Sequence, residues 1–530
     1  MRVSVFLLTL LAACALPASS VVFHGGAGEV GGSCATVRSG DFRMLVDCGT
    51  AYGDGEGRTP GERKAECGFP FNPKEYGDLL LTHAHQDHAG RVPELFSAGF
   101  TGTVWVTEAT RELLFVSWKS QIIYDVCTER DWRWAKQTKK PGTRVHWHRD
   151  CEWSRKIGLA NLGTFHGVYS DLQKHVGAAA LGSTYTVACR TCQDLELKEM
   201  LGHLRTVPYD RPVAIGPFKV TFSPVKHLPG SACIRVEEGA TSLLFSGDLG
   251  TLRSHLVRAI PPARKADVVF LESTYGDASQ GTTEEIERDY ARFRAVVGKA
   301  VREGGIAWIP AFALDRSQRV FLEIKRGMDE GVIPADVPIH YLSPSSRDFM
   351  ALYIDHPEWF DEPGTADLAS LFKRTKKSFN PAARRKSGAI LLTTSGMMDT
   401  GHSLRLVPDL VPLEKTAICL VGYQSPGTCG HQLKRIAEGK SKKSSVVLRE
   451  GGSPLEIPVK ASIHVFGCFS GHGDAFENDA WLANNRESRI FLVHGDRAAL
   501  SARMEGLRAR FGAAAEVLEP GRVYDFKQGN

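Results

Sequence analysis

A histidine-rich loop is the feature that most limits how this chain can fold. Residues 83–88 read His-Ala-His-Gln-Asp-His, and they follow a short apolar run at 77–82 that is typical of a buried strand. Imidazole and carboxylate groups are the ligands that cations such as Zn²⁺ or Mn²⁺ accept. Four such groups packed together without a cation would repel one another to no purpose. The sequence therefore predicts a metal site at the end of a strand rather than a solvated polar loop.

Three more ligand-type residues stand where apolar runs end. His227, Asp248 and His494 each follow a strand-like segment and lie in or beside a glycine-containing turn. The ends of neighbouring strands meet at one edge of a sheet, so residues far apart in the chain can build one site there. We therefore expect these three residues to join the 83–88 loop in a single metal centre.

The overall composition places the chain among large globular proteins. It has 530 residues, of which 42% are hydrophobic and 24% charged, and this balance excludes a disordered chain. The net charge of +5 is too small to indicate a nucleic-acid binder by itself. From residue 284 the pattern alternates between helix (284–304), strand (306–312) and helix (317–331), which predicts an α/β fold with a parallel sheet.

The first twenty residues differ from the rest. A basic start, a short apolar stretch and small residues up to Ser20 are typical of a secretory signal. Residues 11–14 also resemble a bacterial lipoprotein box with Cys14 as the lipidated residue, and a mis-set start or an extra buried strand stays open. The chain is expected to be exported, as a periplasmic protein or a lipoprotein, if this segment is a signal, and cytoplasmic otherwise. No apolar run is long enough to span a membrane.

Further motifs extend the pattern over nearly the whole chain. They are LESTYG at 271–276, PAFALDRSQ at 310–318, LSPSS at 342–346, TTSGMMDTG at 393–401, VGYQSPGTCG at 421–430, SGHGD at 470–474 and VHGD at 493–496. With the predicted metal ligands they resemble the metallo-β-lactamase fold and its β-CASP nuclease branch, which includes ribonuclease J and the endonuclease of the cleavage and polyadenylation machinery. One departure is Asp315, where relatives usually carry glycine before the arginine.

The resemblance implies an architecture with one domain inserted into another. We expect an α/β protein, a metallo-β-lactamase αββα sandwich with an inserted α/β β-CASP domain. The expected division is a signal or lipoprotein-type peptide at 1–20, the first part of the sandwich at 21–276, the β-CASP domain at 277–468 and the second part of the sandwich at 469–530.

The resemblance also implies the roles of the metal ligands. One cation is expected on His83, His85 and His227, and a second on Asp87, His88 and His494, with Asp248 bridging the two. Asp47 is expected to orient the ligand loop from behind. The implied cofactors are two Zn²⁺, with Mn²⁺ as the alternative, and a hydroxide shared by the two cations is the implied nucleophile.

The catalytic and substrate-binding residues follow from the same likeness. His472 is expected to act as the general acid and Glu272 to hold its imidazole, with Asp87 and Asp248 completing the catalytic set. Hydroxyl and amide donors at Ser343, Ser345, Thr394, Ser395 and Gly396 are expected to line the substrate cleft. RNA is the expected substrate, because RNA-processing members carry histidine at the position of His494.

Other functions stay open at this point. A nuclease for DNA, or an exported non-specific nuclease, is one alternative, and a non-catalytic RNA-binding scaffold is an alternative from another class. Neither exo- nor endonucleolytic cleavage is favoured. The expected partner is RNA or another single-stranded nucleic acid, and a homodimer is allowed.

An insertion at about 120–200 has no counterpart of this length in the family. It interleaves aromatic and basic residues, which could grip single-stranded nucleic acid or form a small packed subdomain. These residues are Trp132, Arg133, Trp134, Lys136, Lys139, Lys140, Arg144, Trp147, Arg149 and Trp153. Cys127, Cys151, Cys189 and Cys192 fall in or beside it, and a small zinc site, two disulfides or free thiols are all compatible with their spacing.

Overall fold

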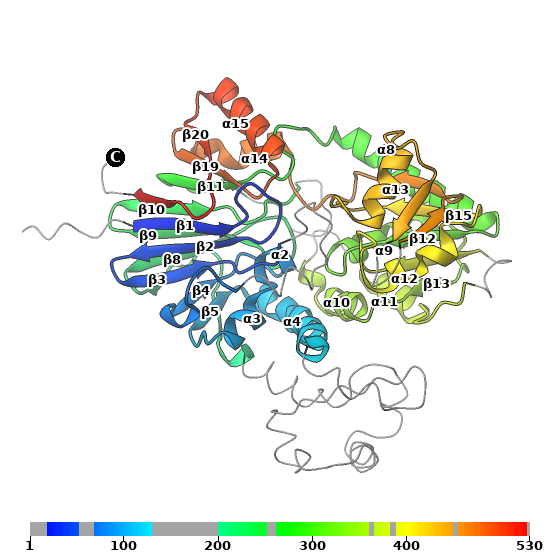
Figure 1. Ribbon diagram of the computed structural model, residues 1–530, viewed down its shortest axis with the longest axis horizontal. Coiled ribbons are helices and arrows are strands. Elements are labelled where there is room, and N and C mark those ends of the chain that lie inside the picture. Colours follow the sequence, from blue (N-terminus) through cyan, green and yellow to red (C-terminus); the bar gives the residue numbers. More distant parts are fainter. Residues whose placement is uncertain are drawn as a thin grey trace, which may run out of the picture.

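The computed structural model describes residues 19–51, 68–129, 200–251, 261–359, 365–381, 388–448 and 454–526. Two lobes lie side by side (Figure 1). Two seven-stranded sheets form one lobe, and a five-stranded sheet with helices on both faces forms the other. Residues 130–199, which make up most of the insertion, lie outside the described residues, as do residues 1–18. The predictions made for the insertion's tryptophans and for Cys127, Cys151, Cys189 and Cys192 stay predictions.

The first seven-stranded sheet has the order β21-β1-β2-β3-β4-β5-β6. Pairing is antiparallel from β21 to β3 and parallel from β3 to β6. The expected leader overlaps this sheet, because Ser19 and Ser20 are buried and pair with Phe526 and Asp525. The strands are β1 (Ser19–Gly25), β2 (Cys34–Ser39), β3 (Phe42–Val46), β4 (Asp78–Leu80), β5 (Thr103–Val106), β6 (Leu204–Thr206) and β21 (Val523–Phe526).

The second seven-stranded sheet has the order β20-β19-β11-β10-β9-β8-β7. Its β7-to-β10 half is antiparallel, and its β10-to-β20 half is parallel. The strands are β7 (Val213–Ile215), β8 (Phe218–Pro224), β9 (Ala232–Glu238), β10 (Thr241–Phe245), β11 (Val268–Glu272), β19 (Arg489–Val493) and β20 (Ala515–Val517).

An aromatic core holds the two sheets face to face. Phe23 from the first sheet lies 5.2 Å from Phe270 of the second, measured between ring centroids, and Phe270 stacks on Phe245 at 4.6 Å. The outer faces are covered by helices, as Figure 1 shows. These are α2 (Gln86–Ala89), α3 (Val92–Ser97), α4 (Glu108–Glu129), α14 (Ala475–Trp481) and α15 (Arg497–Phe511), with short 3-10 turns at Pro73–Glu75 and Leu482–Asn484.

The second lobe is built on a fully parallel sheet of order β13-β14-β12-β15-β18. Both faces are buried, so its central strands read as continuous apolar runs. The strands are β12 (Ile306–Pro310), β13 (Ile339–Tyr341), β14 (Ala389–Thr393), β15 (Thr416–Leu420) and β18 (Ser462–Val465), and a separate hairpin joins β16 (Ser445–Leu448) to β17 (Leu455–Pro458).

Helices cover both faces of this parallel sheet. The first helix begins at a capping box in which the Thr282 hydroxyl accepts from the Glu285 amide and the Glu285 carboxylate accepts from the Thr282 amide. Helices α8 to α11 pack on one face and α12 and α13 on the other. They are α8 (Thr283–Arg302), α9 (Arg316–Asp329), α10 (Pro344–Asp355), α11 (Thr365–Lys373), α12 (Gly401–Leu410) and α13 (Cys429–Ala437), with a 3-10 turn at Pro357–Trp359.

An apolar interface joins the two lobes. Leu314, Phe349 and Tyr353 of the second lobe belong to the same buried cluster as Leu113 and Leu114 of α4, and Figure 1 shows α10 beside α4. This packing fixes the carboxyl ends of the second lobe's parallel strands opposite the sandwich. The expected α/β architecture, a sandwich with an inserted α/β domain, is confirmed, while the exact domain boundaries stay a prediction. Among the described helices, none has the length and apolar character needed to cross a membrane.

Candidate metal centre

The 83–88 loop leaves strand β4 at the junction of the two lobes. Its backbone is tied to the neighbouring strand end, because the Asp47 amide donates to the Leu80 carbonyl at 2.8 Å and the Cys48 amide to the His88 carbonyl at 2.7 Å. Close approach requires glycine beside it: a Cβ on Gly49 would lie 1.6 Å from the Asp87 carbonyl oxygen. The loop is therefore held rigidly before any cation binds.

The first group of ligand-type atoms comes from His83, His85, His227 and Asp248, all within 4.8 Å of one another. The His85 Nδ1 and His227 Nε2 atoms are 2.9 Å apart. Asp248 Oδ2 lies 3.5 Å from the Nε2 atoms of both His83 and His227. These four residues leave three different strands, β4, β8 and β10, at one end of the sandwich.

The second group comes from Asp87, His88, His494 and the same Asp248. Asp248 Oδ1 lies 3.1 Å from His88 Nε2 and 3.4 Å from His494 Nδ1, and His494 Nε2 lies 3.4 Å from Asp87 Oδ2. Asp248 thus turns one carboxylate oxygen toward each group.

Buried polar atoms without partners show that this arrangement suits a cation. Among the described residues, His83 Nε2, Asp87 Oδ1 and both Asp248 oxygens are buried and have no hydrogen-bond partner. Leaving such atoms unsatisfied is costly, and each unsatisfied group needs a physical explanation. Other such atoms occur elsewhere among the described residues, but these four gather within the two groups of ligand-type side chains, so the residues present fit a metal site.

A set of hydrogen bonds orients the histidine rings. Asp47, at a positive φ of 59°, accepts from the Thr82 amide and hydroxyl at 2.8 Å each and from His88 Nδ1–H at 2.7 Å. His227 Nδ1–H donates to the Gly471 carbonyl at 2.9 Å. Each bond fixes the orientation of its ring and directs Nε2 into the site. Sequence reasoning found Asp47 but missed Thr82 and the Gly471 carbonyl.

Some titratable side chains of the centre are neutral and others are ionised. Burial is the main cause that lowers the pKa values of His83, His85 and His227, so these rings are neutral. Burial also opposes the charges of His88 and Asp248, but attraction to opposite charges outweighs it. The pKa of His88 is therefore raised well above its usual value, and that of Asp248 is lowered well below. Cations bind neutral imidazoles and ionised carboxylates, so the three neutral rings and Asp248 are already in the binding form, whereas His88 must release its proton on binding.

His472 and Glu272 lie at the rim of this centre. His472 Nδ1 is 3.4 Å from Glu272 Oε1, and His472 Nε2 is 4.0 Å from Asp248 Oδ2. Burial opposes protonation of His472, but Asp248 and Glu272 together raise its pKa. Thr274, which sequence reasoning did not single out, contacts His494 Nδ1 at 3.0 Å and His472 Nδ1 at 3.4 Å through its hydroxyl. Glu272, His472 and His494 also form a third group of ligand-type atoms.

The residues expected to bind substrate lie at strand ends of the parallel sheet rather than in the metal cluster. Ser343 follows β13 and is buried, and its hydroxyl accepts from the Ser346 amide at 3.2 Å to cap α10. Ser345 lies 3.3 Å from Ser343, measured between hydroxyl oxygens. Thr394, Ser395 and Gly396 follow β14; the Ser395 hydroxyl bonds Asp399, and a Cβ on Gly396 would lie 2.9 Å from the Phe312 amide nitrogen.

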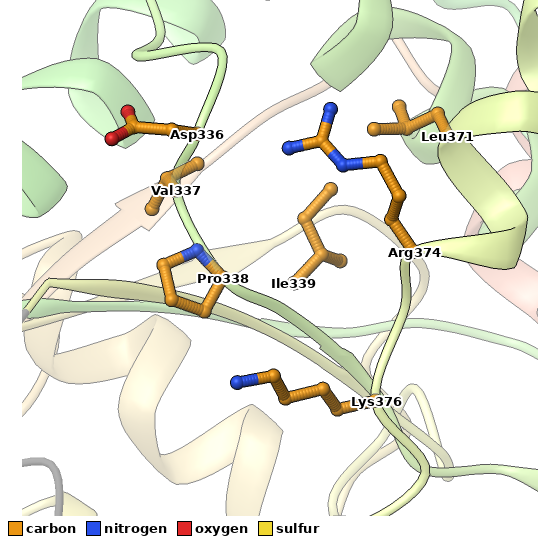
Figure 2. A pocket seen from close by; sticks show the side chains of 7 residues that line it. All are labelled: Asp336, Val337, Pro338, Ile339, Leu371, Arg374 and Lys376. Atoms are coloured by element: carbon orange, nitrogen blue, oxygen red, sulfur yellow. The ribbon is translucent and has the colours of Figure 1, made fainter.

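A pocket lies at the opposite end of the parallel sheet, apart from the metal centre. Figure 2 shows Arg374 and Lys376 beside the start of β13, whose carboxyl end leads to Ser343. The Arg374 guanidinium donates to the Ala335 carbonyl at 2.9 Å. Neither basic residue is among the metal-cluster residues.

Comparisons with known families agree with this architecture. The sequence matches the metallo-beta-lactamase superfamily model over residues 27–126 and the Beta-Casp domain over residues 317–433. It also matches the Zn-dependent metallo-hydrolase RNA specificity domain over residues 456–518.

Curated relatives align along nearly the whole chain. Ribonuclease TTHA0252 of Thermus thermophilus is 29% identical over 521 residues, which cover 94% of this chain and 100% of the relative. Transcription termination factor FttA of Methanocaldococcus jannaschii is 27% identical, covering 90% of this chain and 67% of its own. FttA of Methanosarcina mazei is 28% identical, with coverage of 90% and 66%. A crystal structure of an Enterococcus faecalis protein of unknown function covers 96% of this chain at a TM-score of 0.47 and 12% identity.

The predicted family is confirmed. The structure is a sandwich with groups of ligand-type residues at one end and an inserted parallel-sheet domain. Three family models of this superfamily match along the chain. The chain belongs to the β-CASP nuclease family of the metallo-β-lactamase superfamily and is a metal-dependent hydrolase.

Proposed function

We propose that this chain is a ribonuclease that hydrolyses phosphodiester bonds at a centre of two divalent cations. The observation that carries the proposal is the position of Asp248, whose two carboxylate oxygens face two separate groups of buried ligands. Shared carboxylates of this kind suit paired cations, which act together on the attacking and leaving oxygens of an in-line displacement.

Each of the two groups would hold one cation. His83, His85 and His227 would hold one, and Asp87, His88 and His494 the other, with Asp248 common to both. When bound, two cations supply an activated water and positive charge for the phosphate in the transition state. Zn²⁺ fits this mixture of imidazole and carboxylate ligands, and Mn²⁺ is the alternative.

His472 would give a proton to the leaving oxygen. Its Nε2 faces Asp248 at 4.0 Å, so it is directed toward the place where a phosphate between the two groups would lie. Glu272 contacts its Nδ1 and is itself fixed, because its carboxylate accepts from the Leu249 amide at 3.2 Å and the Thr274 amide at 2.9 Å. A ring held in this way presents its Nε2 proton in one direction, as a general acid requires.

RNA is the substrate that the surroundings favour. Tyr275, 39% exposed, lies with its ring centroid 6.3 Å from that of His472 and donates from its hydroxyl to Ser470 at 2.9 Å. An exposed ring fixed beside the site can stack on a base. The matching RNA specificity model and the ribonuclease relative support the same choice. Ser343, Ser345, Thr394, Ser395 and Gly396 would line the cleft that receives the RNA. The intact ligand set argues against a non-catalytic scaffold.

Cleavage of labelled single-stranded RNA by the full-length protein tests the proposal. Metal-loaded protein should cleave the RNA, a chelator should abolish cleavage, and added Zn²⁺ or Mn²⁺ should restore it. A DNA strand of the same sequence should be cleaved much more slowly. Equal cleavage of both strands would support the broader nuclease alternative, and binding of RNA without cleavage by metal-loaded protein would support the scaffold.

A further inference from the structure

Arg316 occupies an unusual position between the two lobes. It follows strand β12 of the parallel sheet and is the first residue of helix α9. The carboxyl ends of β12, β14 and β15 lie next to one another, because the three strands are parallel neighbours. Ligands of open parallel sheets bind outside these carboxyl ends. Arg316 therefore lies where such a sheet would receive a ligand.

The backbone just before Arg316 is strained. Asp315 has φ 65° and ψ −55°, and the Arg316 amide donates to the Leu314 carbonyl at 2.8 Å, two residues back. This is a γ-turn with positive φ, which is rare and strained for a residue other than glycine. Strain of this kind persists only where surrounding structure holds it, and it gathers at functional sites. Here the turn sets the direction in which the Arg316 side chain leaves α9.

The Arg316 guanidinium has donors to spare. One nitrogen, Nη1, donates to the Val421 carbonyl, while Nε is buried and has no partner. Within the described ranges, no carboxylate forms an ion pair with Arg316. Its neighbour Arg319 differs, since it donates to the Ser470 and Phe469 carbonyls and lies 3.8 Å from Asp315. Burial and Arg319 lower the pKa of Arg316, but an arginine stays charged at neutral pH.

The unpaired charge lies close to the metal centre. A Cβ placed on Gly471 would be 3.3 Å from His227 Cε1 and 3.7 Å from Arg316 Nη2. The two side chains are thus within about 7 Å of each other, on either side of Gly471. His227 turns its Nδ1 toward Gly471 and its Nε2 toward Asp248. Arg316 therefore lies across Gly471 from the His227 ring, at the edge of the metal centre.

We propose that Arg316 binds a backbone phosphate of the RNA, one nucleotide away from the bond that is cleaved. This inference rests on the proposed ribonuclease function and names a residue that positions the substrate. Arginine presents its donors in a planar fork that matches phosphate oxygens, and a charged pair of this kind is strong where water is scarce. Because Nη1 donates to the Val421 carbonyl and no carboxylate of the described residues pairs with Arg316, the edge of the fork formed by Nε and Nη2 is left for a ligand.

Two substrates separate this role from a role at the scissile phosphate. Arg316→Gln should lower kcat/KM for single-stranded RNA by about 10- to 100-fold, mainly through KM, because one charged contact is lost. Hydrolysis of bis(p-nitrophenyl) phosphate, which has no neighbouring phosphate, should stay within about two-fold. Binding of phosphorothioate RNA to the metal-loaded variant should show a salt slope flatter by about 0.7.

Arg374→Gln is the matched control. Arg374 is an exposed arginine of the same domain that likewise donates to one backbone carbonyl, but it lies at the opposite end of the sheet (Figure 2). This variant should keep the wild-type KM and salt slope. Arg316→Lys should recover the salt slope but only part of the affinity, because lysine keeps the charge without the fork. The melting temperature of every variant shows whether it is folded.

Three results would overturn the inference. Equal losses of activity on RNA and on the small diester would show that Arg316 stabilises the metal centre rather than binding a neighbouring phosphate. An unchanged KM for RNA in Arg316→Gln would show that Arg316 does not contact the RNA. An equal rise in KM in Arg374→Gln would show that the effect comes from the net charge of the domain rather than from the position of Arg316. Wild-type protein that hydrolyses the small diester yet neither binds nor cleaves RNA would refute the ribonuclease proposal itself, and with it this one.

Discussion

Replacing His472 with alanine should separate proton transfer from metal binding. The ring touches the centre only at its rim, with Nε2 at 4.0 Å from Asp248, and Asp248 is held by four other histidines. We therefore expect the variant to keep its cations. General acids contribute about 10²–10⁴-fold to the rate, so RNA cleavage should fall by that factor, or about 3–5 kcal/mol of barrier.

The leaving group decides how much of that loss appears. The leaving oxygen of RNA is a poor leaving group and needs a proton, whereas p-nitrophenolate does not. Hydrolysis of a p-nitrophenyl phosphodiester by His472→Ala should thus stay within about ten-fold of wild type. Tyr275→Phe is the control, since it removes only the hydroxyl that donates to Ser470 and keeps the ring beside His472. It should change RNA cleavage by less than about ten-fold, because a neutral hydrogen bond contributes about 0.5–1.5 kcal/mol.

The assay combines single-turnover rates on both substrates with metal analysis. Equal loss on RNA and on the activated diester would refute proton transfer and indicate a positioning role. Loss of a cation in His472→Ala would instead make His472 a ligand, as its closeness to Glu272 and His494 permits.

Three further outcomes follow from the geometry. Asp248→Asn should lose more metal and more activity than His494→Gln, because only Asp248 faces both ligand groups; equal effects in metal analysis and rate would argue against a shared ligand. Asp47→Asn should weaken metal affinity by about 10- to 100-fold without removing a ligand, since Asp47 holds His88 and Thr82 in place but does not face the site itself; an unchanged affinity in a metal titration would contradict this. Asp315→Gly should be about 1–3 kcal/mol more stable than Asp315→Ala in denaturant unfolding, because both lack the carboxylate and only alanine keeps a β-carbon at φ 65°; equal stabilities would mean that the turn relaxes.

Sequence patterns predicted which residues would gather in the two groups, because each stands at the end of an apolar strand or in the 83–88 loop, and strand ends converge. They could not predict what each ring hydrogen-bonds to. The bonds from His227 to the Gly471 carbonyl and from His494 to Thr274 depend on how the 470–474 and 493–496 turns pack after folding.

Long-range pairing and unusual backbone were also beyond the sequence patterns. The small residues at 19 and 20 suggested a cleavage region, whereas in the fold they pair with β21 near the other end of the chain. Asp315 was recognised as a departure from the family, but its positive φ, the Arg316 contact with the Val421 carbonyl and the lack of a partner for Arg316 Nε among the described residues depend on how distant segments pack. Such features depend on tertiary packing, which no local pattern records.

The metal content of the full-length protein tests the central claim most directly. Protein purified without chelator and dialysed mildly should contain about two equivalents of Zn²⁺ or Mn²⁺ per chain, and RNA cleavage should rise with occupancy of the second. Asp248→Asn, measured in the same way, should hold one equivalent or none and be inactive. A wild-type chain that cleaves RNA at full rate with one equivalent or none would contradict the account.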